Sequence, residues 1–203
     1  MKSVIFEDKE VIPSKVLCVG RNYVEHIYEL KNQIPDEIVL FIKANSAISN
    51  RFIKPKGRCR YEGEISFIVE DGKYVGVGFG IDLTLVEEQE KAKKKGLPWE
   101  KAKAFDNSGI FSKFVKIDNF YGLEMKLFKN GNLVQFGSID LMINKPDDIL
   151  SEIKKYFSLE DYDIVMTGTP KGVGDFEVGD EFIGQILKYG KVLVEERWIV
   201  EKI

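Results

Sequence analysis

Short strand-like runs account for most of the sequence, and glycine-rich turns separate them more often than helices do. An Asn-Gly pair at 130–131 lies between two such runs, which is typical of a hairpin. Helical composition is limited to 83–95 and 146–157, with a shorter helical turn at 21–30. Because strands do not alternate with helices, the pattern argues against a Rossmann-type sheet and predicts an α+β, mostly β protein with few helices. Strands are expected at 16–20, 39–42, 65–69, 74–81, 123–128, 133–136, 164–167, 182–187 and 192–200.

The composition excludes several classes of protein. With 203 residues, of which 44% are hydrophobic and 31% charged, the chain is expected to form one domain with an ample core. A net charge of −3 gives no general attraction to nucleic acid or to anionic membranes. No apolar run reaches the roughly 18 residues of a membrane helix, and the first residues lack the order of a signal peptide. Cys18 and Cys59 are not spaced as metal ligands, so we expect reduced thiols in a cytoplasmic protein.

Three acidic residues form the first candidate site. Glu62 and Glu64 occupy alternate positions of a predicted strand, so their side chains are expected on one face. Asp82 ends another predicted strand and can close on the same point. Three carboxylates, with water in the remaining positions, suit Mg²⁺ or Mn²⁺, and such an ion polarises a bound carbonyl or carboxylate. The alternative is a strand with a solvated acidic edge.

His26 is the only histidine of the chain, and Glu29 follows it by three residues. On a helix the two side chains can meet, and a carboxylate beside an imidazole orients the ring and raises its basicity. This pair is therefore a candidate general base. The alternative is a surface histidine beside a surface glutamate.

Two further segments offer contacts to an anionic substrate. Lys103 is expected in a loop between aromatic residues, where it could pair with a substrate anion rather than lie on a solvated face. The glycine-rich stretch 168–174 lacks the spacing of a nucleotide-binding P-loop and is not followed by a helical pattern. We expect it to present the Thr169 hydroxyl and backbone N–H groups to a carboxylate, with an ordinary turn as the alternative.

With these motifs in place, the chain resembles the fumarylacetoacetate hydrolase superfamily, in its small single-domain branch of acylpyruvate hydrolases and oxaloacetate decarboxylases. The resemblance extends over nearly the whole chain and is most specific at 96–108 and in the 166–174 loop. The matching segments, in family order, are VLCVGRNYVEHIYEL, VLFIKANSAI, YEGEISFIVE, GIDLT, KKKGLPWEKAKAFDNS, NGNLVQFGSIDLM and DYDIVMTGTPKGVGDFEVGDEF.

The resemblance implies a mixed β-sandwich roll, commonly a homodimer, with residues 1–203 as one catalytic domain and a mobile lid within 1–35. It also implies a function for each of nine residues. The implied metal ligands, for Mg²⁺ or Mn²⁺ (with Ca²⁺ possible in a crystal), are Glu62, Glu64 and Asp82. The implied catalytic residues are His26, Glu29 and Lys103. The implied substrate contacts are Lys43, Gln89 and Thr169.

The sequence departs from the family pattern near the implied site. Val86 stands where family members often carry an arginine, four residues after the metal-binding aspartate. Losing a charged hydrogen bond there would cost about 1.5–3 kcal/mol of substrate binding. Arg60 and Tyr61 replace a frequent His-His pair, and the link between Glu64 and Asp82 is short. These changes bear on the substrate and leave the three carboxylates in place.

The function expected from the resemblance is a divalent-metal-dependent hydrolase that cleaves a C–C bond of acylpyruvate-type 2-oxoacids and also decarboxylates oxaloacetate. The alternatives are an isomerase or decarboxylase of hydroxymuconate-type diacids in aromatic catabolism, and a non-catalytic oxoacid-binding paralogue. The expected partner is a small 2-oxoacid, without nucleic acid or membrane.

Overall fold

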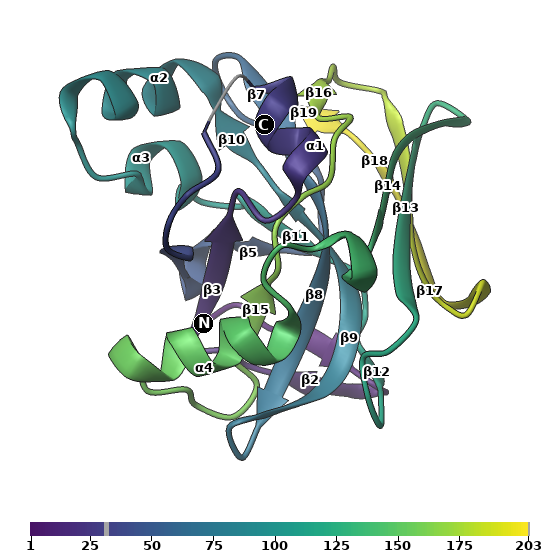
Figure 1. Ribbon diagram of the computed structural model, residues 1–203. Coiled ribbons are helices and arrows are strands. Elements are labelled where there is room, and N and C mark those ends of the chain that lie inside the picture. The colour runs from purple at the N-terminus through teal and green to yellow at the C-terminus, as the bar shows by residue number, and fades with distance from the viewer. Residues whose placement is uncertain (31–32, 203) are drawn as a thin grey trace.

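The computed structural model describes residues 1–30 and 33–202 (Figure 1). In this part of the chain strands far outnumber helices, and the α+β, mostly β fold expected from the sequence is confirmed. No helix in the described residues is long and apolar enough to span a membrane. The helices are α1 (Val24–Glu29), α2 (Val86–Lys95), α3 (Glu100–Lys103) and α4 (Pro146–Tyr156), with 3-10 turns at Asn45–Ala47 and Ile139–Leu141.

The largest sheet is mixed and carries the residues of the candidate site. Its central strands β8 and β9 pair antiparallel, whereas β15 runs parallel to β3. In spatial order its strands are β4 (Val39–Ala44), β3 (Lys15–Gly20), β15 (Ile164–Met166), β8 (Gly63–Glu70), β9 (Lys73–Asp82), β11 (Gly109–Phe111) and β5 (Ile48–Ser49), and β12 (Val115–Lys116) pairs with β9.

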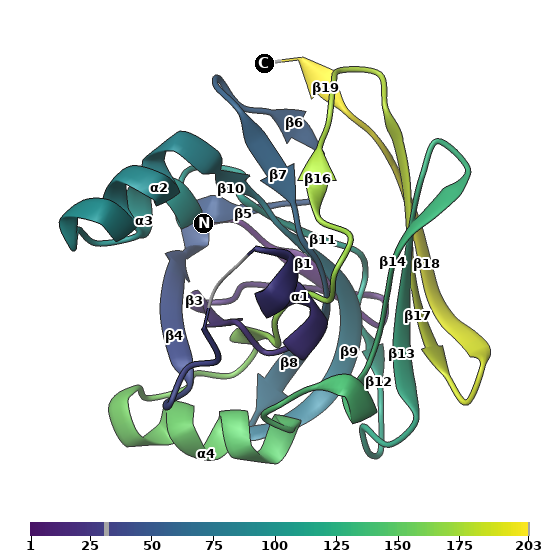
Figure 2. The same cartoon turned by 45° about the horizontal axis from the view of Figure 1, so that its top comes forward.

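A second, antiparallel sheet packs against β8 and β9, and three small sheets complete the roll (Figures 1 and 2). The second sheet has the order β14 (Asn132–Ser138), β13 (Leu123–Lys129), β17 (Glu181–Lys188) and β18 (Lys191–Ile199). The small sheets are β10 (Thr84–Leu85) with β7 (Cys59–Tyr61) and β16 (Gly174–Asp175), β1 (Val4–Phe6) with β2 (Lys9–Val11), and β19 (Glu201–Lys202) with β6 (Ile53–Lys54).

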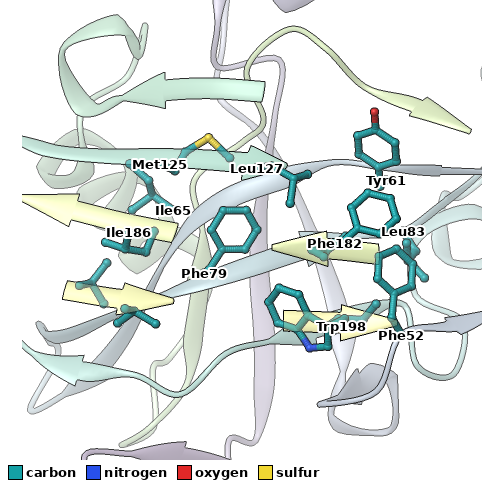
Figure 3. Packing of buried hydrophobic residues seen from close by; sticks show 14 of the residues in the cluster. Phe52, Tyr61, Ile65, Phe79, Leu83, Met125, Leu127, Phe182, Ile186 and Trp198 are labelled. Carbon is teal, nitrogen blue, oxygen red and sulfur yellow. The ribbon is translucent and has the colours of Figure 1, made fainter. Parts of the chain in front are cut away.

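The main hydrophobic core lies between the two large sheets. Figure 3 shows Phe79 of β9 in this layer, surrounded by side chains of the facing sheet such as Ile186 and Trp198. The Phe79 ring is completely buried, and its centroid lies 6.2 Å from that of Trp198. On the other face of the large sheet, α4 buries Ile149 and Ile153. Because both faces of β8 are covered, the strand is an uninterrupted buried run rather than an alternating one.

Glycines at alternate positions of β9 mark the close approach of a neighbouring segment, as the sequence indicates. A Cβ atom on Gly78 would lie 3.0 Å from the carbonyl oxygen of Lys113, and one on Gly80 would lie 2.3 Å from Ser66 Oγ. No side chain fits at either position without moving its neighbours.

Two of the predicted helices are shorter in the structure than the sequence suggested. The helix expected over 83–95 begins only at Val86, because Thr84 and Leu85 pair with Arg60 and Cys59 as strand β10. It ends as expected at Gly96, which has φ +61°. The helical turn expected over 21–30 is limited to α1. Cys18 and Cys59 are both buried free thiols.

We predict that Phe79→Ala lowers the free energy of unfolding by about 3–5 kcal/mol, because a fully buried ring leaves a cavity between two sheets that cannot collapse. Chemical denaturation measures this change. Tyr156→Ala is the control, since Tyr156 is 68% exposed and its loss should change stability by no more than about 0.5 kcal/mol. Equal effects of the two substitutions would contradict this assignment of the core.

Candidate active site

Strands β8 and β9 bring three carboxylates to one buried point. Glu62 immediately precedes β8, Glu64 lies within it, and Asp82 ends β9. The Asp82 backbone N–H donates to the Glu62 carbonyl oxygen at 2.8 Å, so these two residues face each other across the strand pair. One carboxylate oxygen from each of the three residues lies within 4.8 Å of the others, and all three side chains are buried. Three like charges at this separation need positive charge beside them.

Lys103 supplies part of that charge. Its Nζ donates to Glu62 Oε2 and Asp82 Oδ2, each at 2.7 Å, and to Thr84 Oγ1 at 2.5 Å. Burial opposes the charge of this ammonium group, but Asp82 and Glu62 outweigh burial and raise the pKa of Lys103. Burial likewise opposes the charge of Glu62, and Lys103 outweighs it, so the pKa of Glu62 lies below its ordinary value. Lys103 is the last residue of α3, not a loop residue as the sequence suggested.

Lys43 approaches the same carboxylates from inside the protein. It is completely buried on β4, and its Nζ lies 2.8 Å from Asp82 Oδ1 while donating to Ser108 Oγ and to the Lys103 carbonyl oxygen. The ammonium group is not aligned for a hydrogen bond to Asp82, and Oδ1 is a buried oxygen without a hydrogen bond among the described residues.

Glu64 is the least compensated of the three acids. Its Oε2 accepts the Gly168 backbone N–H at 2.7 Å. Burial, reinforced by the charges of Asp82 and Glu62, raises the pKa of Glu64 well above its ordinary value. An all-oxygen set in which Asp82 Oδ1 has an ion pair but no hydrogen bond and Glu64 is undercompensated fits a hard divalent cation. The triad could therefore bind a divalent metal ion.

The loop from Gly168 to Gly172 connects this triad to the histidine. Besides the bond from Gly168 to Glu64, the Gly172 backbone N–H donates to Glu29 Oε1 at 3.0 Å. Gly172 has φ +100°, and a Cβ atom there would lie 1.9 Å from the Val134 carbonyl oxygen, so only glycine fits.

The side chains of α1 lie against that loop. His26 Nδ1 is 3.1 Å from Glu29 Oε2, so the two residues meet as the spacing predicted, with His26 buried and Glu29 partly exposed. Lys171 also forms an ion pair with Glu25 at 3.1 Å. Residues 31 and 32 of the predicted lid lie outside the described residues, and the mobility of the lid stays a prediction.

Thr169 is placed beside the triad, but its hydroxyl already has partners. Its Oγ1 donates to the Gly63 carbonyl oxygen at 2.9 Å and accepts from Gln135 Nε2 at 2.8 Å. The predicted contact to a substrate carboxylate therefore requires the hydroxyl to leave Gly63, because a hydroxyl has one proton to donate.

Gln135 is a site residue that the sequence analysis missed. Its Oε1 accepts the Gly63 backbone N–H, between the two glutamates, while its Nε2 donates to Thr169 Oγ1 and to the Pro170 carbonyl oxygen. If the two strands paired regularly from the Asn-Gly turn onward, Gln135 would lie opposite Lys126, on the solvent side. A bulge between Leu127 and Phe128 shifts the register so that Gln135 faces Leu127 and points inward. Nothing in the residue pattern reveals that shift.

A cavity opens above the triad and contains about 450 Å³ of atom-free space, part of it open to solvent. Seven of the nine predicted site residues line it, whereas Glu29 and Lys43 are not among the described residues that do. The lining residues are Val19, Gly20, Arg21, His26, Leu30, Phe41, Glu62, Glu64, Asp82, Gln89, Lys93, Trp99, Lys103 and Thr169.

Comparisons with known proteins agree with this architecture. Residues 15–196 match the family described as fumarylacetoacetate (FAA) hydrolase C-terminal. The chain is 38% identical over 188 residues to the oxaloacetate tautomerase YcgM of Escherichia coli, covering 83% of this chain and 86% of that protein. It is 38% identical over 196 residues to the mitochondrial oxaloacetate tautomerase oaa1 of Schizosaccharomyces pombe, covering 85% and 88% of the two chains.

Solved structures show the same fold. A crystal structure from Oleispira antarctica superimposes with a TM-score of 0.93 at 33% identity, covering 98% of this chain and all of that one. The fumarylpyruvate hydrolase of Pseudomonas aeruginosa, crystallised with Mn²⁺ and pyruvate, superimposes with a TM-score of 0.89 at 26% identity, covering 100% of this chain and 96% of that one. The two tautomerases and the Pseudomonas hydrolase are named as enzymes, and their names refer to small oxoacids.

We predict that a divalent ion stabilises the protein more at pH 8 than at pH 5.5. The pKa of Glu64 is higher in the folded protein than in the unfolded chain, so protonated Glu64 stabilises the folded state. This stabilisation is complete below the unfolded-state pKa and is lost as the pH rises through the folded-state pKa. An ion that displaces this proton therefore binds more weakly in acid. The shift in melting temperature on adding MnCl₂, measured at both pH values, tests this. Glu64→Gln should abolish the shift, and equal shifts at both pH values would contradict the expectation.

We also predict that Gln135→Leu destabilises the fold by about 1–3 kcal/mol, because it leaves the buried Gly63 N–H without its partner and removes one donor from the Pro170 carbonyl. It should also weaken Mn²⁺ binding, since both glutamates flank Gly63. Urea unfolding and equilibrium dialysis measure the two effects. Gln185→Leu, on a partly exposed strand position, is the matched control and should leave Mn²⁺ binding unchanged.

Proposed function

Because the chain belongs to the fumarylacetoacetate hydrolase family, we propose that it is a divalent-metal-dependent enzyme that enolises small 2-oxoacids. The observation that carries this proposal is the buried triad of Glu62, Glu64 and Asp82 within one cavity with His26. When bound there, a divalent ion would withdraw electron density from a 2-oxo group and acidify the neighbouring C–H. Mg²⁺ or Mn²⁺ suits the oxygen ligands, and the Mn²⁺ of the Pseudomonas relative supports that choice.

The residues around the triad can perform the proton transfers of such a reaction. Glu29 binds Nδ1 of His26, which leaves Nε2 to exchange a proton with a ligand in the cavity. Lys103 carries positive charge beside Glu62 and Asp82, where it can stabilise negative charge developing on a substrate oxygen. Gln89 and Thr169 line the same cavity and can orient the oxoacid.

Keto–enol tautomerisation of oxaloacetate is the activity we propose first. The oxaloacetate tautomerases of Escherichia coli and Schizosaccharomyces pombe are similar to this chain over most of both sequences, which supports this substrate. In the tautomerisation, His26 removes a proton from C3 of the keto form, the oxo oxygen takes up a proton from water, and protonated His26 returns its proton to the hydroxide that remains. The reverse transfer restores the ketone.

Hydrolysis of an acylpyruvate, the function expected from the sequence, is the second candidate. His26 with Glu29 would deprotonate a water that adds to the distal carbonyl. The C–C bond then breaks to a carboxylic acid and the pyruvate enolate, which Lys103 can stabilise. The pyruvate-bound fumarylpyruvate hydrolase supports this activity. Decarboxylation of oxaloacetate would need the same enolate stabilisation without an activated water.

A substrate panel tests the proposal. Oxaloacetate, acetylpyruvate, fumarylpyruvate and a hydroxymuconate are each assayed with Mg²⁺ or Mn²⁺, and again after chelation. We expect activity on at least one of the 2-oxoacids and its loss with chelator. Absence of turnover on all four with either ion would favour a non-catalytic oxoacid-binding protein. Full activity in excess chelator would refute the metal requirement.

We predict that His26→Ala lowers tautomerisation and hydrolysis by about 10²–10⁴-fold, the usual contribution of a general base. Decarboxylation of oxaloacetate should fall much less, since it needs no nucleophile. Steady-state kinetics of the variant measure both. Tyr28→Ala, exposed on the same helix, is the control and should retain activity. If His26→Ala stays within a few-fold of wild type on every substrate, His26 is not the base.

A further inference from the structure

Two basic side chains line the cavity without carrying any part of the proposed chemistry. Lys93 lies on α2 four residues after Gln89, so both occupy the same helix face, and both line the cavity. Lys93 is also exposed, which places it at the opening. Arg21 lines the cavity from the opposite segment, directly after β3.

The backbone holds Arg21 at this position in spite of strain. Arg21 has φ +58°, a left-handed conformation that residues with side chains seldom adopt. The next residue, Asn22, fixes it: Asn22 is fully buried, and its side chain bonds to the carbonyl oxygens of Asn144 and Thr167 and to the Asn144 N–H. Strain that the surrounding structure enforces in this way is typical of functional sites.

Arg21 and Lys93 are electrostatically unsatisfied. Within the described residues neither forms an ion pair, whereas Lys43 and Lys103 are both engaged by the acidic triad. Although Lys93 is exposed at the opening, partial desolvation, together with the positive charges of Arg21 and Lys103, lowers the pKa of Lys93. Two cations that line one cavity without an ion-pair partner of their own are in an arrangement that a negatively charged group of a ligand would stabilise.

The positive charges of the site fall into two groups. Lys43 and Lys103 are engaged by the acidic triad, where the oxoacid end of a ligand would lie. Arg21 and Lys93 line the same cavity without an ion pair among the described residues, so they can balance a second negative charge on the ligand.

We propose that Lys93, assisted by Arg21, binds the distal carboxylate of a dicarboxylic 2-oxoacid and makes the site selective for dianions over monoanions. This inference rests on the proposed function, because the first carboxylate and the 2-oxo group must lie at the triad. Among the described residues of α2, Lys93 is the cation that lines the cavity. Val86, two turns before Lys93 on the same helix face, is uncharged.

A matched pair of substrates isolates the distal charge. Oxaloacetate and its 4-methyl ester have the same oxoacid end, and the ester lacks the distal negative charge. For Lys93→Met we expect kcat/KM on oxaloacetate to fall about tenfold or more, mainly through KM, which corresponds to losing one charged hydrogen bond. Activity on the ester should stay within about twofold of wild type.

Lys95→Met is the matched control, because Lys95 is exposed on the same helix but outside the cavity lining. It should leave both substrates unchanged. Lys93→Glu should enlarge the loss on oxaloacetate and spare the ester. Equal effects of Lys93→Met on the two substrates, or no effect on either, would overturn the proposal.

A binding measurement separates failure of this inference from failure of the proposed function. Trp99 lines the cavity, so quenching of its fluorescence can report binding of 2-oxoglutarate and of its 5-methyl ester to Mn²⁺-loaded protein without turnover. If no substrate is turned over but Lys93→Met selectively weakens binding of the diacid, the proposed function fails and the carboxylate subsite stands. If wild type binds diacid and ester equally, the subsite is wrong whatever the enzyme catalyses.

Discussion

The burial of three carboxylates at one point is the constraint on which the rest of the site depends. Within 4.8 Å of one another and shielded from water, the side chains of Glu62, Glu64 and Asp82 repel strongly unless positive charge lies among them. Lys103 and Lys43 supply two such charges and engage the triad from two sides. They leave Glu64 undercompensated, so the triad could accommodate one more cation.

The 168–172 loop turns this electrostatic arrangement into a site with two functional ends. Its first N–H binds the metal-ligand candidate Glu64, and its last binds Glu29 of the histidine pair. Between them Gln135 ties the loop to the backbone of Gly63. Movement of the loop therefore changes the spacing between the triad and the proposed base, and the two large sheets hold that loop in place.

The sequence could predict those parts of the site that depend on strand alternation and helix spacing. Glu62 and Glu64 share a face because strands have a period of two, and His26 meets Glu29 because helices bring residues three apart together. It could not predict features that depend on tertiary pairing. The bulge that turns Gln135 inward and the pairing of Thr84 that delays α2 are set by partner strands. The location of Lys93 in the cavity depends on how α2 packs.

Anomalous diffraction from crystals grown with Mn²⁺ would test the central claim most directly, because it locates the ion independently of activity. The account predicts one strong peak per chain, at about 2.0–2.3 Å from oxygens of Glu62, Glu64 and Asp82, with Lys103 Nζ moved away from at least one of its two carboxylates. Absence of a peak among the three carboxylates at saturating Mn²⁺, with Lys103 still bound to both Glu62 and Asp82, would contradict it.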